Sequence, residues 1–163
     1  MTPDVTPDVT PDAGPFTLTS TAFVDHGTLP AEYTCDGVGH SPPLAWSGVP
    51  AGTVEFALLM TTLARDGLKW NWVLYSIPAD ARMLTTGSSG TGTAGLTSDG
   101  PALAYSPPCS RGPGPMMYTW TLYALSGRPT LPTRANLVTG AVLTDAIRTL
   151  TLASASMTAT YTR

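Results

Sequence analysis

The segment that decides the fold reads Tyr33-Thr-Cys-Asp-Gly-Val-Gly-His-Ser-Pro-Pro-Leu-Ala-Trp46. Glycine and proline interrupt it repeatedly, and both residue types mark turns rather than helices or continuous strands. The segment contains Cys35, one of two cysteines, and His40, one of two histidines. It is therefore predicted to be a long turn-rich loop that holds some of the most reactive side chains of the chain.

On both sides of this loop the chain contains short β-type stretches separated by proline and glycine. They are rich in aromatic and β-branched residues, which favour strands. The predicted strands are 16–20, 54–60, 70–77, 118–125 and 156–161. Sequential strands with turn-rich connections predict a mostly β protein with an antiparallel β-sandwich.

Two other segments have different patterns. Residues 143–152 place Leu143, Ile147 and Leu150 on one face, which predicts a short helix near the C-terminus with Thr144 as its N-cap. Residues 85–101 are rich in glycine, serine and threonine with little apolar surface to bury. They are predicted to form a long surface loop.

The composition restricts the classes of partner. The 163 residues fit one domain, 12% of them are charged, and the formal net charge is −3. The eight lysines and arginines are scattered, so no basic surface for nucleic acid is expected. The longest apolar run, residues 56–60, is far too short to span a membrane as a helix.

Residues 2–13 contain three consecutive Thr-Pro-Asp units. Proline at every fourth position opposes helices and sheet ladders, so residues 1–15 are predicted to be a disordered linker before a domain of residues 16–163. The linker is either an inert tail or a spacer. Acidic spacers of this kind follow the lipidated cysteine of exported bacterial lipoproteins, which predicts a periplasmic or cell-surface protein whose only membrane contact is an N-terminal lipid anchor. The residues are also compatible with a cytoplasmic location.

The 33–46 segment resembles the signature of the bacterial branch of the phosphatidylethanolamine-binding proteins, also called Raf kinase inhibitor-like proteins. Further blocks resemble the family in the same order. These are Gly52-Thr-Val-Glu-Phe-Ala-Leu59, Asn71-Trp-Val-Leu-Tyr-Ser-Ile-Pro78, Tyr105-Ser-Pro-Pro-Cys109, Tyr118-Thr-Trp-Thr-Leu-Tyr-Ala-Leu125 and Thr160-Tyr-Thr-Arg163. The resemblance implies an antiparallel sandwich with a small pocket at one end that binds phosphate, acetate or phospholipid head groups.

The residues at the family's pocket positions differ from the family pattern. Where the family has Asp-Pro-Asp-Ala-Pro, this chain has Thr62-Leu-Ala-Arg-Asp66, and Asn71 replaces a histidine before Trp72. Where the family has His-Arg-Tyr, the chain has Met116-Met-Tyr118. The pocket positions implied by the resemblance are Thr62, Ala64, Asn71, Tyr105, Pro108, Met116 and Tyr118.

Loss of the imidazoles and their carboxylate partners removes charge-assisted hydrogen bonds to an anion, each worth about 1.5–3 kcal/mol. Phosphate-type anions are therefore expected to bind weakly or not at all. The remaining side chains fit a neutral or amphipathic small molecule. The predicted function is a non-enzymatic binding module without a cofactor. The alternative is a protein-interaction module, such as a protease or signalling inhibitor, that uses the loops around the pocket mouth.

In the family fold, the loops of Cys35 and Cys109 both lie near the pocket mouth. The resemblance thus implies a disulfide between them, which is typical of an oxidising compartment. Two separate buried thiols are the alternative. For Arg65, Asp66 and Lys69, the alternatives are a solvated turn, which we favour, and a new polar rim.

The histidines provide no convincing catalytic or metal site. His40 precedes Ser41, but neighbouring residues in an extended loop point apart, and no nucleophile elbow surrounds this serine. Cys35 and His40 lack the paired spacing of a four-ligand zinc site. We therefore expect no catalytic residue and no metal ligand.

Overall fold

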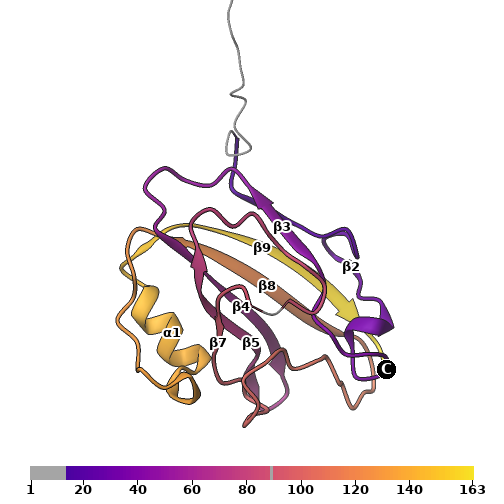
Figure 1. Ribbon diagram of the computed structural model, residues 1–163. Helices are drawn as coiled ribbons and strands as arrows, with labels where there is room; N and C mark the ends of the chain where they lie inside the picture. Colours follow the sequence, from indigo (N-terminus) through magenta and orange to yellow (C-terminus); the bar gives the residue numbers. More distant parts are fainter. Residues whose placement is uncertain (1–13, 89) are drawn as a thin grey trace, which may run out of the picture.

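The computed structural model describes residues 14–88 and 90–163, so the prediction for residues 2–13 lies outside the described residues. Strands make up most of the regular structure (Figure 1). One helix, α1, and two short 3₁₀ turns, Ala31–Tyr33 and Ala135–Leu137, complete it in these ranges. The strands are β1 Thr17–Thr19, β2 Gly27–Thr28, β3 Leu44–Ser47, β4 Glu55–Ala64, β5 Gly67–Pro78, β6 Met83–Leu84, β7 Thr93–Ala94, β8 Met116–Leu125 and β9 Thr151–Tyr161, and α1 is Gly140–Ile147.

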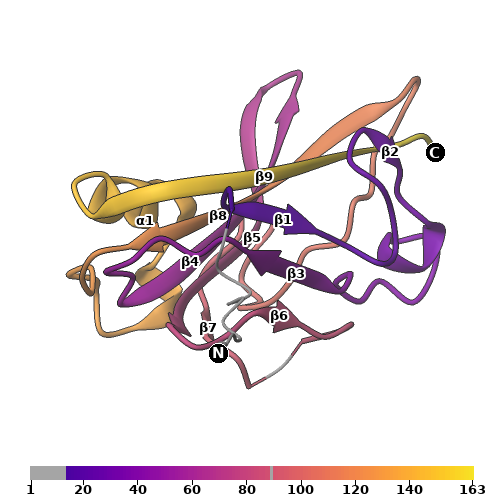
Figure 2. The same ribbon diagram turned by 90° about the horizontal axis from the view of Figure 1, so that it is seen from above.

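The strands form two sheets that pack face to face (Figure 2). The smaller sheet has the order β1-β3-β6, and the larger has the order β2-β9-β8-β4-β5-β7. Neighbouring strands are antiparallel except for the short parallel pair of β2 and β9. The predicted antiparallel sandwich is thus confirmed, with α1 on the outer face of the larger sheet (Figure 1).

Alternation of side chains along the strands produces two cores. Between the sheets lies the larger core, in which Phe56, Met60 and Trp120 are completely buried. On the other face, Leu59 and Val73 of the sheet pack against Leu143 and Ile147 of α1. Each fully buried side chain of this size contributes roughly 1.5–3 kcal/mol to the free energy of unfolding.

Close contact between α1 and the sheet depends on a glycine. A Cβ atom placed on Gly140 would lie 2.0 Å from Cγ of Trp70, so a larger residue does not fit without movement of the ring. Trp70 is partly buried and packs against this second core. The Trp70 ring is therefore part of the packing between α1 and the sheet.

The predicted bounds of the helix were wrong. Helix α1 begins at Gly140, and its N-cap is Thr139, whose Oγ1 accepts a hydrogen bond from the Val142 N–H at 3.1 Å. Thr144 lies inside the helix and donates to the carbonyl of Gly140. Glycine is a poor helix former, but here it allows the contact with Trp70, so tertiary packing overrides local propensity.

The last strand and the glycine-rich loop also differ from prediction. Strand β9 begins at Thr151 rather than 156, because its first half pairs with β8 as well. Segment 85–101 includes strand β7, which pairs with Leu74 and Tyr75 of β5. Its Gly95 N–H donates to the Val73 carbonyl, so part of this segment belongs to the sheet rather than to a surface loop.

Among the described residues, no helix has the length and apolar character needed to cross a membrane.

Candidate functional site

An open cleft lies at the end of the larger sheet where β4, β5 and β8 project beyond the rest of the domain (Figure 2). It has a volume of about 770 Å³. Five of the seven pocket residues implied by the family resemblance line it, namely Thr62, Ala64, Asn71, Met116 and Tyr118. Tyr105 lines a different cavity of about 470 Å³, and Pro108 lines neither of these two cavities.

Tyr105 and Pro108 have structural contacts instead. The Tyr105 hydroxyl donates to the Tyr33 carbonyl at 2.7 Å, and its ring packs edge-on against Trp72. The Pro108 carbonyl accepts from the Cys35 N–H at 3.0 Å. Both residues therefore join the 33–46 loop to the 105–109 loop, which forms one wall of the cleft.

Strand pairing positions the residues on the cleft floor. Thr62 pairs with Tyr118 of β8 on one side and with Lys69 of β5 on the other. Asn71 is the extra residue of a β-bulge, because Met60 pairs with Trp72 while the next residue, Thr61, pairs with Trp70. A bulge redirects a side chain, and this one allows Asn71 to reach the cleft although both flanking tryptophans are packed elsewhere.

Two polar atoms on this floor lack a hydrogen-bond partner. Oγ1 of Thr62 and Oδ1 of Asn71 are buried and unpaired, and each residue is only 6% exposed. A buried polar group without a partner costs roughly 1–3 kcal/mol. Two such atoms in one cleft indicate positions at which a bound molecule can complete the hydrogen bonding.

The tyrosine of the floor is a neutral donor. Burial raises the pKa of the Tyr118 phenol, and the nearby Asp99 carboxylate raises it further. Asp99 also lines the cleft, and its Oδ2 accepts from the Ser106 hydroxyl at 2.7 Å. The floor therefore offers a hydroxyl, an amide and a protonated phenol, with no charged group among these three.

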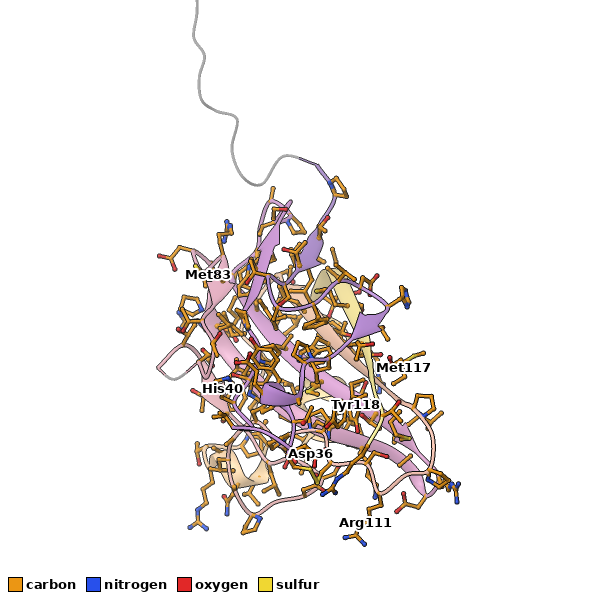
Figure 3. All side chains as sticks on the ribbon, turned by 90° about the vertical axis from the view of Figure 1, so that its right-hand side faces the viewer. Asp36, His40, Met83, Arg111, Met117 and Tyr118 are labelled. Carbon is orange, nitrogen blue, oxygen red and sulfur yellow. A yellow bond between two sulfur atoms is a disulfide. The ribbon has the colours of Figure 1, made fainter. Side chains whose placement is uncertain are left out.

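The rim of the cleft has a different character. Four cationic side chains line it, from Arg65, Lys69, Arg111 and Arg163, together with Asp66 and Asp99. Lys69 Nζ lies 3.0 Å from Asp66 Oδ2, and this hydrogen bond lowers the pKa of Asp66. In Figure 3, Tyr118 lies inside the domain, whereas Arg111 extends from its surface.

The same wall is also held by a disulfide and by the end of the chain. The predicted Cys35–Cys109 disulfide is present, with Cα atoms 5.3 Å apart. Arg163 Nε lies 3.0 Å from Asp36 Oδ1, and its guanidinium also contacts the Cys109 sulfur. The Tyr161 hydroxyl donates to the other oxygen of Asp36, so the C-terminus is fastened to the loop that contains the disulfide.

Sequence reasoning missed the three charged lining residues Asp99, Arg111 and Arg163. They are widely separated along the chain. Asp99 and Arg111 belong to no family block, and Arg163 ends the last block without being a pocket position of the family, so no local pattern could have identified them. For Arg65, Asp66 and Lys69, the favoured prediction is a solvated turn. They do form the β4–β5 turn and its flank, but they also line the cleft, as the alternative reading of a polar rim requires.

His40 and Ser41 lie outside the cleft. They line the smaller cavity, where His40 Nε2 is 3.1 Å from Glu32 Oε2 and its ring packs on Tyr33. Ser41 is only 3% exposed. His40 is therefore a half-buried loop histidine that contacts a carboxylate and an aromatic ring.

Comparison with known proteins agrees with this geometry. The family profile described as phosphatidylethanolamine-binding protein matches residues 19–162. A UPF0098 protein of Chlamydia muridarum is 31% identical over 150 residues, covering 88% of this chain and 97% of that protein. A protein of Mycobacterium tuberculosis that carries the name of a lipoprotein, LppC, is 33% identical over 129 residues, covering 78% of this chain and 64% of that protein.

Two solved structures have the same fold. CT736 of Chlamydia trachomatis, described as a phosphatidylethanolamine-binding protein homolog, superimposes with a TM-score of 0.82 at 29% identity, covering 91% of this chain and 97% of that chain. YbcL of E. coli superimposes with a TM-score of 0.81 at 25% identity, covering 91% and 98%. The order of the sequence blocks, the sandwich and the cleft at its end have one explanation: the chain belongs to the phosphatidylethanolamine-binding protein family.

Proposed function

We propose that the protein is a non-enzymatic binding module that holds a small uncharged polar or amphipathic group on the floor of the cleft. The observation that carries this proposal is the pair of buried, unpaired oxygens, Thr62 Oγ1 and Asn71 Oδ1. Both lie on one floor beside Tyr118 and Met116. A ligand that supplies hydrogen bonds there relieves the desolvation of these atoms on binding.

The shape of the cleft supports a ligand rather than a purely structural role. Its volume lies in the range of small-molecule sites, roughly 300–1,000 Å³. Met116 presents an adaptable apolar surface beside the polar atoms, which suits an amphipathic molecule.

Several features favour binding over catalysis. The described residues that line the cleft include no histidine, and the one cysteine among them is bonded to Cys35. Thr62 therefore has no imidazole base with which to form an activated nucleophile.

The proposal is tested by NMR titration with small uncharged probes, glycerol and acetamide. We expect shifts centred on Asn71 and Tyr118, and we expect Thr62→Val to weaken them because valine keeps the shape but removes the hydroxyl. Thr85→Val, on an exposed threonine outside the cleft lining, is the control. Probe shifts spread over other surfaces, or unchanged in Thr62→Val, would argue against a site on this floor.

The proposal also implies that simple anions bind very weakly or not at all. Inorganic phosphate and phosphoethanolamine are expected to show no measurable binding at millimolar concentration, because the floor has no charged donor to hold them. Calorimetry checks this. Saturable binding of either compound with shifts at Asn71 and Tyr118 would contradict it.

We also propose that the protein works outside the cytoplasm. The Cys35–Cys109 disulfide supports this, because structural disulfides persist in oxidising compartments. The lipoprotein name of the M. tuberculosis relative and the Thr-Pro-Asp spacer support it as well. The location is tested by fractionating cells that express the protein. Each fraction is then assayed for free thiols and for attached lipid. Recovery only in the soluble cytoplasm with free thiols would refute it.

A separate observation supports the alternative, a protein-interaction module. Leu63, Leu68 and Met117 are 74%, 49% and 56% exposed, and they lie at the projecting end of the sheet beside the cleft. Figure 3 shows Met117 pointing away from the domain. If these side chains contact a protease, the wild type inhibits it and the Leu63→Ser, Met117→Ser double variant does not. Equal inhibition by both, or none by either across a protease panel, would count against this role.

A further inference from the structure

The disulfide that holds the cleft wall is accessible from outside the domain. Cys35 and Cys109 are both exposed residues, and Cys109 also lines the cleft. Exposed disulfides are reduced more easily than protected ones, and they are the ones that take part in exchange and regulation. This bond therefore fixes the wall at a place where a reactant can reach it.

The surroundings of the two sulfur atoms differ. Arg163 Nη1 donates to Cys109 Sγ at 3.4 Å. Within residues 14–88 and 90–163, no cationic side chain donates to Cys35 Sγ. A nearby cation stabilises a thiolate, and a more stable thiolate leaves faster when a disulfide is attacked. Cys109 is therefore the better leaving group of the two.

The ion pair with Asp36 does not occupy the whole guanidinium of Arg163. Arginine has five N–H donors in a fixed fork, and here Nε meets Asp36 Oδ1 at 3.0 Å while Nη1 meets the sulfur. Asp36 is itself held by the Tyr161 hydroxyl. These contacts keep the guanidinium beside Cys109. Because the Arg163 side chain is 46% exposed, water weakens its effect on a thiolate, so a moderate effect on reactivity is expected.

The two loops have contacts that do not depend on the sulfur atoms. The Cys35 N–H donates to the Pro108 carbonyl at 3.0 Å, and the Tyr105 hydroxyl donates to the Tyr33 carbonyl at 2.7 Å. Both contacts join the 33–46 loop to the 105–109 loop. They keep the two cysteines close to each other after the bond opens, which favours its re-formation.

We propose that the Cys35–Cys109 bond is a site of reversible exchange with low-molecular-weight thiols. The thiolate of the small thiol attacks Cys35 Sγ and forms a new S–S bond there, while the Cys35–Cys109 bond breaks. The electron pair of the broken bond leaves on Cys109 Sγ, beside Arg163. The attacking sulfur is oxidised and the Cys109 sulfur is reduced, so no other oxidant or reductant is needed. Attack of the Cys109 thiolate on Cys35 restores the original bond and expels the small thiol.

Exchange at this bond also changes the cleft. Because Cys109 is part of the lining, the opened form adds a thiolate to the cleft and removes the covalent tie between its two loops. The inference is independent of the ligand proposed above. Failure of either one leaves the other standing.

The test is cleavage of the native protein by 2-mercaptoethanol, an uncharged monothiol. Samples are quenched with acid at early times, and mass spectrometry of the peptides locates the first adduct. We expect the mixed disulfide on Cys35 and a free thiol on Cys109. Arg163→Gln should slow cleavage by roughly three- to tenfold, because it removes the cation beside the leaving sulfur. Arg163→Lys keeps the charge and should retain most of the wild-type rate.

A further variant, Asp36→Asn, separates charge from loosening of the wall. Arg163→Gln and Asp36→Asn both remove the ion pair, so loosening alone would accelerate cleavage in both. Asparagine can still accept from Arg163 and lacks the negative charge that opposes a thiolate. Asp36→Asn should therefore react at least as fast as the wild type, while Arg163→Gln is slow. Arg134→Gln, at an exposed arginine outside the cleft lining, is the control and should match the wild type.

Reversibility is measured by removing the small thiol by gel filtration. The intact bond should return without an added oxidant, and an adduct that persists would contradict the proposal. It would also be overturned by a first adduct mainly on Cys109, or by cleavage of Arg163→Gln as fast as the wild type. Arg163→Lys as slow as Arg163→Gln, or Asp36→Asn slower than the wild type, would refute the role of the charge. A bond that resists the thiol until urea unfolds the protein would show that the site is closed to exchange.

Discussion

Strand β4 passes through two regions that differ in packing. In its first half, Ala57 and Leu59 are covered by α1 while Phe56 and Leu58 face the opposite sheet, so both faces are covered. In its second half, Thr62 and Ala64 line an open cleft, and Leu63 on the other face is 74% exposed. Thr62 in the second half has a buried oxygen without a hydrogen-bond partner. Within one strand, the first half is thus packed into both cores, whereas the second half borders the open cleft.

The largest expected effect comes from breaking the bond that holds the cleft wall. The Cys35–Cys109 disulfide joins residues 74 apart in sequence, and its removal in the Cys35→Ser, Cys109→Ser double variant should lower the free energy of unfolding by about 3–5 kcal/mol. Chemical denaturation measures the loss. Hydrogen exchange should accelerate most in the 33–46 and 105–115 loops and least under α1. Equal acceleration in these loops and under α1 would mean that the cleft end and the packed end of the domain do not open independently.

A smaller loss is expected from a change in the packed half. In Gly140→Ala, the new methyl group would meet the Trp70 ring at 2.0 Å, so we expect destabilisation of about 1–3 kcal/mol through overpacking. Gly127→Ala is the matched control, because its methyl group would have an ordinary contact of 3.6 Å with Leu150. Thermal denaturation compares the two. Similar melting temperatures would show that α1 tolerates a shift and is less tightly packed than its contacts indicate.

A pair of isosteric exchanges tests the two environments directly. Thr34→Val removes a hydroxyl that donates to the Ala31 carbonyl and accepts from the Asp36 N–H, and it should cost about 1–2 kcal/mol. Thr62→Val removes a hydroxyl that is also buried but has no partner, so it should leave stability unchanged or raise it by about 1 kcal/mol. Urea denaturation measures both. If Thr62→Val destabilises as much as Thr34→Val, then the Thr62 hydroxyl has a stabilising role in the unliganded protein.

The smallest effect is expected outside both regions. Deletion of residues 2–13 should leave the melting temperature within about 1–2 °C of the wild type, because the Thr-Pro-Asp repeat has little apolar surface to bury. A contact worth about 1 kcal/mol would change it by roughly 2–4 °C. Scanning calorimetry can therefore detect such a contact. A clear decrease would place the tail against the domain.

Long strands were predicted well, and short ones were not. The cores of β4, β5 and β8 follow from runs of apolar and aromatic residues at 54–60, 70–77 and 118–125. Strands β2, β6 and β7 have two residues each, too few to show any periodicity. They exist because a neighbouring strand offers an unpaired edge, which is a property of the assembled sheet.

The cleft was predicted only in part for a similar reason. Thr62, Asn71, Met116 and Tyr118 were found through the family motifs, which place them at pocket positions. Arg111 belongs to no family block, and it reaches the rim through the course of a loop. Arg163 ends the last family block but is no pocket position of the family, and it reaches the rim because it follows the end of β9. Scattered charges in a sequence give no sign that they meet.

Ordered motifs and the residue types at named positions already indicate the family, the sandwich, the disulfide partners and the loss of charge from the pocket floor. Folding, in contrast, sets where helix α1 begins, leaves two floor oxygens without a partner, and brings half of the cationic side chains to one rim. Those properties depend on which atoms lie near each other after folding. Residues distant in sequence are brought together by the pairing of strands, and no local pattern encodes that distance.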